Sequence, residues 1–391
     1  MSSMSPIYSL LNQHFIMKHY LRTSLLLLLG VAFALTAQAQ QSVLVNGIYY
    51  LLDAQTKTAA VTAGDNYSGH IAIPGSVVYE STSYAVTSIG KSAFSGTDVA
   101  SVSIPASVTS IDDVAFNYCY SLTAIDIPSS VTSIASGAFG VCPALASISV
   151  REGNPVFDSR DNCNAIIQIS DNTLLVGCKS TTIPLTVTSI GDYAFRGCSE
   201  MSTIDIPSSV TRIGWAAFGE CTSLTSIVLP TSVTSLGDYA FYGCSALTSL
   251  SIPQSVTSIG SGAFERCTAL ASINIPSAIT HIGDRTFMFC TSLTSVVCAA
   301  VNPPTCAADA FDAVPTASAT LYVPAASLEA YRSAEPWGSF GKINEISTGI
   351  HGVVVDAGHG AAAAAAYNLK GQRTNQPRKG IYIIGGQKVL R

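Results

Sequence analysis

The sequence predicts a β-dominated solenoid of about ten stacked coils of 23 residues, closed by a cap at each end. Three observations predict this fold class. Phenylalanine recurs at a constant interval, proline keeps the same interval in a second column, and short runs of Ile, Val and Leu alternate with Ser and Thr. A single coil of this kind cannot cover its own apolar side, so it has to stack on its neighbours.

The repeat interval is most regular between residues 184 and 287. Successive phenylalanines from Phe195 to Phe287, and successive prolines from Pro184 to Pro276, are 23 residues apart. Each interval carries the pattern Leu-x-x-Leu-x-Leu, as in residues 224–229, which at this period is typical of leucine-rich repeats. A second β-branched pair follows the proline and also favours extended structure. We therefore expect two short strands per coil, joined by a tight turn or a single helical turn at the Ala-Phe step.

The N-terminal segment has the features of an export signal. A basic stretch at residues 17–22 precedes an apolar stretch at residues 24–35, and Ala37-Gln38-Ala39 matches a small-x-small cleavage site. The apolar run is too short to cross a bilayer comfortably. We expect an exported chain that is cleaved near Ala39 and has no transmembrane span in its mature form.

The remaining segments follow from changes in the repeat. The gap between Phe139 and Phe195 is 56 residues, and it contains two apolar runs, residues 165–169 and 173–177, which indicate a hairpin in one enlarged coil. The expected order is an upstream extension and signal peptide (1–39), an irregular N-terminal cap (40–72), the solenoid (73–311) with its enlarged coil (150–184), a C-terminal cap (312–346), a Gly/Ala linker (347–366) and a short β-rich tail (367–391).

Composition and motifs argue against several functions. The net charge is −5 and charged residues make up only 11%, without a basic tract, so nucleic acid is not an expected partner. The motifs HExxH and GxSxG and a phosphate-binding Walker A loop do not occur. The sequence also shows no pair of acids that would face each other across a glycosidase cleft. We expect no catalytic residues, no cofactor and no enzymatic activity.

A column of cysteines follows the phenylalanines by three residues. The spacing lacks a Cys-x-x-Cys pair and a histidine at ligand distance, so we expect no metal site. Two alternatives remain open: buried thiols that pack as small apolar groups, or scattered disulfides among an odd total of 11 cysteines. The core column comprises Cys119, Cys142, Cys198, Cys221, Cys244, Cys267 and Cys290.

Candidate binding residues are those at which one coil departs from the next. Around each Ala-Phe step the sequence varies, and it is rich in Tyr, Trp and Arg, the residue types that dominate binding hot spots. An alternative interpretation is that these rings pack over the edge of the coil. The candidate partner-binding residues are Tyr193, Arg196, Trp215, Glu220, Tyr239, Tyr242, Glu265, Arg266 and Arg285.

The frame AFxxCxxLTSIxIPxSVTSIG, the segment GNPVFDSRDNCNAII and the ending NPPTCAADAF together resemble the BspA-like leucine-rich repeat proteins, over roughly residues 45–345. The resemblance implies a cell-surface or secreted protein that binds host matrix proteins or other cells through a protein or glycoprotein ligand. We expect a monomer. A structural or self-associating surface component and a glycan-degradation accessory protein are the alternative functions. The C-terminal tail resembles the sorting domain of type IX secretion substrates.

Overall fold

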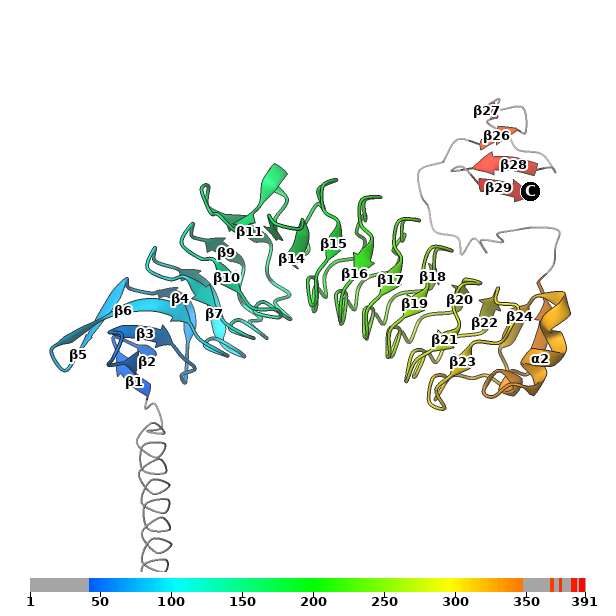
Figure 1. Ribbon diagram of the computed structural model, residues 1–391, viewed down its shortest axis with the longest axis horizontal. Helices are drawn as coiled ribbons and strands as arrows, with labels where there is room; N and C mark the ends of the chain where they lie inside the picture. Colours follow the sequence, from blue (N-terminus) through cyan, green and yellow to red (C-terminus); the bar gives the residue numbers. More distant parts are fainter. Residues whose placement is uncertain (1–41, 347–365, 369–372, 375–380, 385–386, 391) are drawn as a thin grey trace, which may run out of the picture.

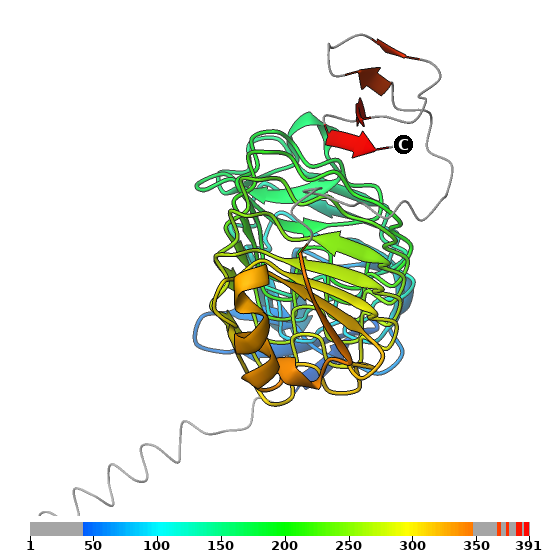
Figure 2. The ribbon, with the colours of Figure 1, turned by 90° about the vertical axis from the view of Figure 1, so that its right-hand side faces the viewer.

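The computed structural model describes residues 42–346 and four short strands of the tail, at residues 366–368, 373–374, 381–384 and 387–390. Residues 42–346 form one arched solenoid whose coils stack along the arch (Figure 1). Figure 2 shows the same coils end-on, where they superpose into a single tube. The upstream extension and signal peptide lie outside the described residues, as does almost all of the Gly/Ala linker.

Two parallel ladders of short strands run along the solenoid, so the expectation of two strands per coil is confirmed for most coils. Equivalent residues pair across neighbouring coils: Ser189 lies opposite Arg212, and Arg212 lies opposite Ser235. This register places like side chains in columns. The first ladder contains β6 (Thr82–Ile89), β8 (Ser110–Ile111), β10 (Ser133–Ile134), β15 (Ser189–Ile190), β16 (Arg212–Ile213), β17 (Ser235–Leu236), β19 (Ser258–Ile259), β21 (His281–Ile282) and β23 (Thr305–Cys306).

The second ladder follows the Leu-x-x-Leu-x-Leu pattern. In the coils at residues 201–230 it is reduced to a single bridge between Asp205 and Val228. Its strands are β4 (Ser68–Ala72), β7 (Asp98–Ser103), β9 (Ala124–Ile127), β11 (Ser147–Val150), β18 (Ser249–Ser251), β20 (Ser272–Ile275), β22 (Ser295–Cys298), β24 (Thr320–Val323) and β25 (Lys342–Glu345).

The phenylalanine column forms the centre of the core. Rings from Phe195 to Phe311 stack face to face, with centroids 5.2–5.6 Å apart, and a shorter stack runs from Phe94 to Phe139. Aromatic residues carry the largest apolar area per side chain, so one ring per coil gives each neighbour a broad contact. Every phenylalanine of this column, from Phe94 to Phe311, is buried.

The enlarged coil interrupts this column. It contains β12 (Phe157–Asp158), a 3₁₀ turn (Arg160–Asn162), β13 (Ala165–Gln168) and β14 (Thr173–Gly177), and β13 pairs antiparallel with β14. In a regular coil the phenylalanine N–H donates to the next coil, as Phe195 N does to Ala217 O. In the enlarged coil Gly177 N makes the equivalent bond to Ala194 O, so Gly177 occupies the phenylalanine position. A Cβ at Gly177 would lie 2.1 Å from the Phe195 ring. Only glycine leaves space for that ring.

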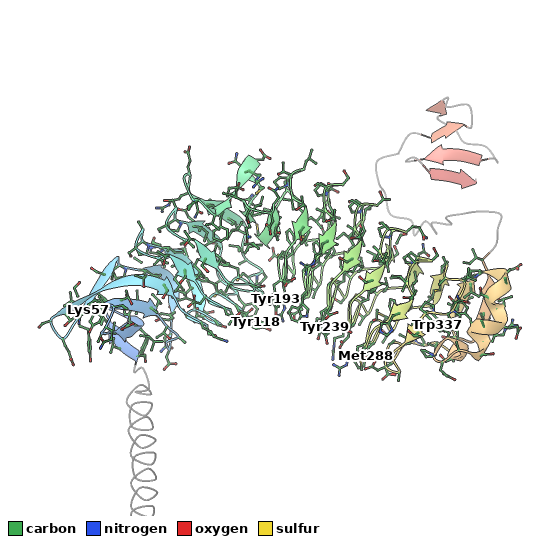
Figure 3. All side chains as sticks on the ribbon, in the orientation of Figure 1. Lys57, Tyr118, Tyr193, Tyr239, Met288 and Trp337 are labelled. Carbon is green, nitrogen blue, oxygen red and sulfur yellow. The ribbon has the colours of Figure 1, made fainter. Side chains whose placement is uncertain are left out.

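The enlarged coil widens only one side of the stack. On the edge formed by the Ala-Phe turns, Val141 N donates directly to Arg196 O at 2.9 Å, so the turns before and after the enlarged coil are neighbours. Extra chain on one side and none on the other bends the stack. In Figure 3 the labelled Tyr118, Tyr193, Tyr239 and Met288 lie along the inner edge of the resulting arch.

The two ends are closed by regular structure and aromatic rings. Residues 42–61 form antiparallel strands, so the expectation of an irregular N-terminal cap is wrong there. These are β1 (Ser42–Val45), β2 (Ile48–Asp53) and β3 (Thr58–Val61), with β5 (Ser76–Tyr79) beside β6. At the other end a 3₁₀ turn (Ala325–Ser327), α2 (Leu328–Ser333) and a second 3₁₀ turn (Trp337–Ser339) cover the last coil, and Trp337 lies 5.3 Å from Phe311.

Strands of both caps continue the ladders. β3 pairs in parallel with β6, and β4 with β7, while β24 and β25 extend the second ladder. The solenoid therefore has about 13 turns, against about ten expected.

The tail strands form a separate antiparallel sheet. They are β26 (Ala366–Asn368), β27 (Arg373–Thr374), β28 (Ile381–Ile384) and β29 (Gln387–Leu390). Within the described residues, no helix has the length and apolarity needed to cross a membrane.

Candidate functional site

The inner edge of the arch is built from turns that share one backbone conformation. In most coils the residues two before and two after the phenylalanine have φ between about 45° and 76°, the left-handed region. Glycine fills some of these positions, as at Gly197 and Gly243. Side chains fill others, although a left-handed residue with a Cβ costs roughly 1–2 kcal/mol. Five candidate residues occupy such positions, namely Tyr193, Glu220, Tyr239, Arg266 and Arg285.

These turns place most of the candidate residues around one depression. It has a volume of about 450 Å³ and lies on the inner edge near the labelled Tyr239 (Figure 3). Seven of the nine candidates line it: Arg196, Trp215, Glu220, Tyr239, Tyr242, Glu265 and Arg285. The structure thus brings together residues that are up to 89 positions apart in the chain.

The other two candidates lie beside the depression. The Tyr193 ring packs on Trp215, with centroids 4.3 Å apart, and Arg266 is 55% exposed with its guanidinium 5.0 Å from the Phe289 ring. The aromatic series then continues, edge to face, from Trp215 to Tyr239 at 5.8 Å and from Tyr239 to Tyr242 at 5.9 Å. Trp215, Tyr239 and Tyr242 are half-buried, so each covers its coil and also presents surface to solvent.

Ion pairs order the polar part of the depression. Arg196 donates to the Glu220 carboxylate at 2.9 Å, and its guanidinium also lies 5.5 Å from the Tyr193 ring. Arg285 lies 3.6 Å from Asp309, which belongs to the next coil. Both pairs join different turns, so they hold the inner edge together across coils.

Glu265 is the exception among these charged residues. Its side chain is only 9% exposed, and its nearest cationic atom is Arg266 Nε at 3.8 Å, beyond hydrogen-bond distance. Among the described residues, none donates a hydrogen bond to its carboxylate oxygens. Its carboxylate oxygens are not among the fully buried polar atoms that lack a partner, so solvent in the depression reaches them.

The sequence did not reveal the aspartates that support this edge. Asp192 accepts a hydrogen bond from Trp215 N and Asp238 accepts one from Ser261 N, both at 2.8 Å, while Asp309 accepts one from Arg285 N. Each carboxylate therefore anchors the turn of a neighbouring coil. The recurrence of aspartate just before the Ala-Phe step was the available signal for this role.

The cysteine column lies in the core, away from the depression. All 11 cysteines are free thiols, and the seven of the column are buried. Six donate S–H to the carbonyl of the phenylalanine one coil back, at 3.0–3.1 Å: Cys119, Cys142, Cys221, Cys244, Cys267 and Cys290. Cys198 donates instead to Gly177 O at 3.9 Å. Cysteine thus acts as a small apolar residue that also satisfies a buried carbonyl.

Burial makes most thiols of the column poor nucleophiles, whereas a hydrogen bond with Cys142 lowers the pKa of Cys119. Loss of hydration raises the pKa of Cys244 and of Cys290 to about 12, far from the range in which a thiolate forms at neutral pH. Within residues 42–346, no three His, Cys, Asp or Glu side chains gather as metal ligands. The geometry of the inner edge suits recognition of a partner through aromatic and charged side chains.

Comparison with solved structures finds similar proteins, one of which has a TM-score above 0.5 and shares this fold. The pneumococcal vaccine antigen PcpA is 17% identical, with a TM-score of 0.53 over 78% of this chain and 98% of that one. A leucine-rich cell surface protein from Faecalibacterium prausnitzii is 24% identical, with a TM-score of 0.46 over 67% of this chain and 96% of that one. A leucine-rich repeat protein from Bacteroides ovatus is 22% identical, with a TM-score of 0.32 over 78% and 99%.

No curated protein matches the sequence. The family comparison does match, with six copies of the BspA type leucine-rich repeat region over residues 79–170 and 171–294. Those residues are more than half of the chain, and they include the stacked coils and the depression described above. The chain belongs to the BspA-type leucine-rich repeat family.

Proposed function

We propose that this protein is exported and surface-exposed, and that it binds a protein or glycoprotein partner along the inner edge of the arch without catalysing a reaction. Matrix proteins and the surfaces of other cells are the partner class. One observation carries the proposal: seven residues chosen for their departure from the repeat line a single depression. The sorting role of the tail stays a prediction.

The chemistry of the inner edge supports a binding role. Tyr, Trp and Arg are the residue types enriched in binding hot spots, because they combine large contact area with directional polar groups. Here they are held by ion pairs and by left-handed turns, so little side-chain freedom is left to be lost on binding. A rigid stack presents these groups at fixed spacing, which suits an extended partner.

The test is a double substitution of the two half-buried aromatic residues, Trp215→Ala with Tyr242→Ala. The full chain and the variant are compared by biolayer interferometry on immobilised, purified matrix proteins. If the inner edge binds, the variant loses about 30-fold or more in affinity for the protein that the native chain binds, as expected for hot-spot truncation.

A matched control removes exposed apolar surface elsewhere. Leu185 and Val228 are among the most exposed apolar residues of the described chain, and neither lines the depression. Leu185→Ala with Val228→Ala should leave the affinity unchanged. Equal affinities for all three proteins, with folding confirmed by circular dichroism, would contradict the proposal.

A further inference from the structure

The depression on the inner edge contains one strong acceptor that the protein itself does not use. The Glu265 side chain is 9% exposed and lines the depression. Arg266 Nε lies 3.8 Å from its carboxylate, and none of the described residues donates a hydrogen bond to it. Of the other charged groups that line it, Arg196 is hydrogen-bonded to Glu220 at 2.9 Å, and Arg285 is ion-paired with Asp309 at 3.6 Å. Glu265 is therefore the carboxylate of the lining that still lacks a hydrogen-bond donor.

The walls of the depression suit the same kind of group. Trp215, Tyr239 and Tyr242 line it together with Glu265, and the three rings meet edge to face. A cation within about 6 Å of an aromatic face is attracted by the ring quadrupole. The inner edge already uses this contact twice, between Arg196 and Tyr193 and between Arg266 and Phe289.

We propose that the depression is a pocket for a basic side chain, Arg or Lys, of the protein partner, with Glu265 as its counter-charge and Trp215, Tyr239 and Tyr242 as its walls. The inference rests on the proposed function, because it names the partner group that the inner edge recognises. A guanidinium or ammonium would supply the donors that Glu265 lacks.

Intrinsic fluorescence gives a direct assay. The chain has two tryptophans, and Trp337 is buried in the C-terminal cap. A change in fluorescence on titration with a ligand therefore reports the surroundings of Trp215. The full chain is titrated at constant ionic strength with acetyl-Gly-Arg-Gly-amide, its Lys analogue, the neutral acetyl-Gly-Gln-Gly-amide, and the oligosaccharide cellohexaose. We expect saturable responses to the Arg and Lys peptides only.

Glu265→Gln provides the decisive variant, because it keeps the shape of the side chain and removes its charge. This variant should bind the Arg peptide with a dissociation constant roughly tenfold or more above that of the native chain. Glu329→Gln, at an exposed position of the C-terminal cap, is the matched control and should leave the response unchanged. Thermal melting checks that both variants fold.

Each outcome decides the inference. Equal responses of the native chain and the Glu265→Gln variant, or a response to cellohexaose alone, would overturn it. If the Arg peptide fails while the Trp215 and Tyr242 double variant still loses a protein partner, the basic-side-chain pocket is wrong and the proposed function stands. If the Arg peptide binds through Glu265 but the double variant keeps its protein partner, the proposed function is wrong.

Discussion

At the scale of single residues, the repeat separates positions that build the coil from positions that vary. Phe241 and Cys244 are fully buried. The Phe241 ring stacks on Phe264 in the next coil, and Cys244 donates S–H to the Phe218 carbonyl in the coil before. The left-handed positions on either side of the phenylalanine accept glycine at little cost, yet Tyr239 and Glu220 occupy two of them. Backbone strain therefore coincides with the varied, half-exposed side chains.

The buried thiols predict a loss of stability at alkaline pH. Burial raises the pKa of Cys244 from 9.0 to about 12, so the folded protein holds this proton more tightly than the unfolded chain. The contribution of this protonated thiol to the free energy of unfolding is complete below about pH 9. It is lost between pH 9 and 12, at about 1.4 kcal/mol per pH unit for each such thiol. Urea unfolding from pH 7 to 11 measures this loss. Above pH 9, the free energy of unfolding of the Cys244→Ala variant should fall less steeply with pH than that of the native chain, by the contribution of one thiol.

Identical slopes for the native chain and the Cys244→Ala variant would show that this thiol ionises in the folded protein as easily as in the unfolded one. Both proteins contain the same tyrosines, so tyrosine ionisation contributes alike to both curves. The comparison isolates the cysteine.

At the scale of elements, the enlarged coil explains the shape of the stack. β13 and β14 add chain on the strand side, whereas Val141 contacts Arg196 directly on the turn side. The turns therefore form one continuous edge across the break in the repeat. Figure 1 shows the arch, with β11 and β14 near its apex.

Deleting residues 151–183 tests this explanation. The deletion joins Val150 to Pro184 and restores a 23-residue interval between Phe139 and Phe195. Without the extra chain on one side the stack should lose its bend, and small-angle X-ray scattering should fit a straight rod. A deletion variant that folds and still scatters as an arch would show that the bend has another origin.

At the scale of the whole molecule, the repeat interval was enough to predict the stacked coils and their two ladders. The depression was only partly predictable. Variation within the repeat identified its lining residues, but the contact between Val141 and Arg196 is concealed by a gap of 56 residues between their phenylalanines. The depression around Glu265 also takes its lining from several coils, which a single repeat unit does not describe.

The central claim is that partners bind at the inner edge, and site-specific photocrosslinking tests it most directly. p-Benzoylphenylalanine is placed at Tyr242 or, as a control, at Leu185, and each chain is irradiated with a matrix protein that the native chain binds. The account predicts a covalent adduct from position 242 and none from position 185. An adduct from position 185 alone would place the partner on a different face and contradict the account.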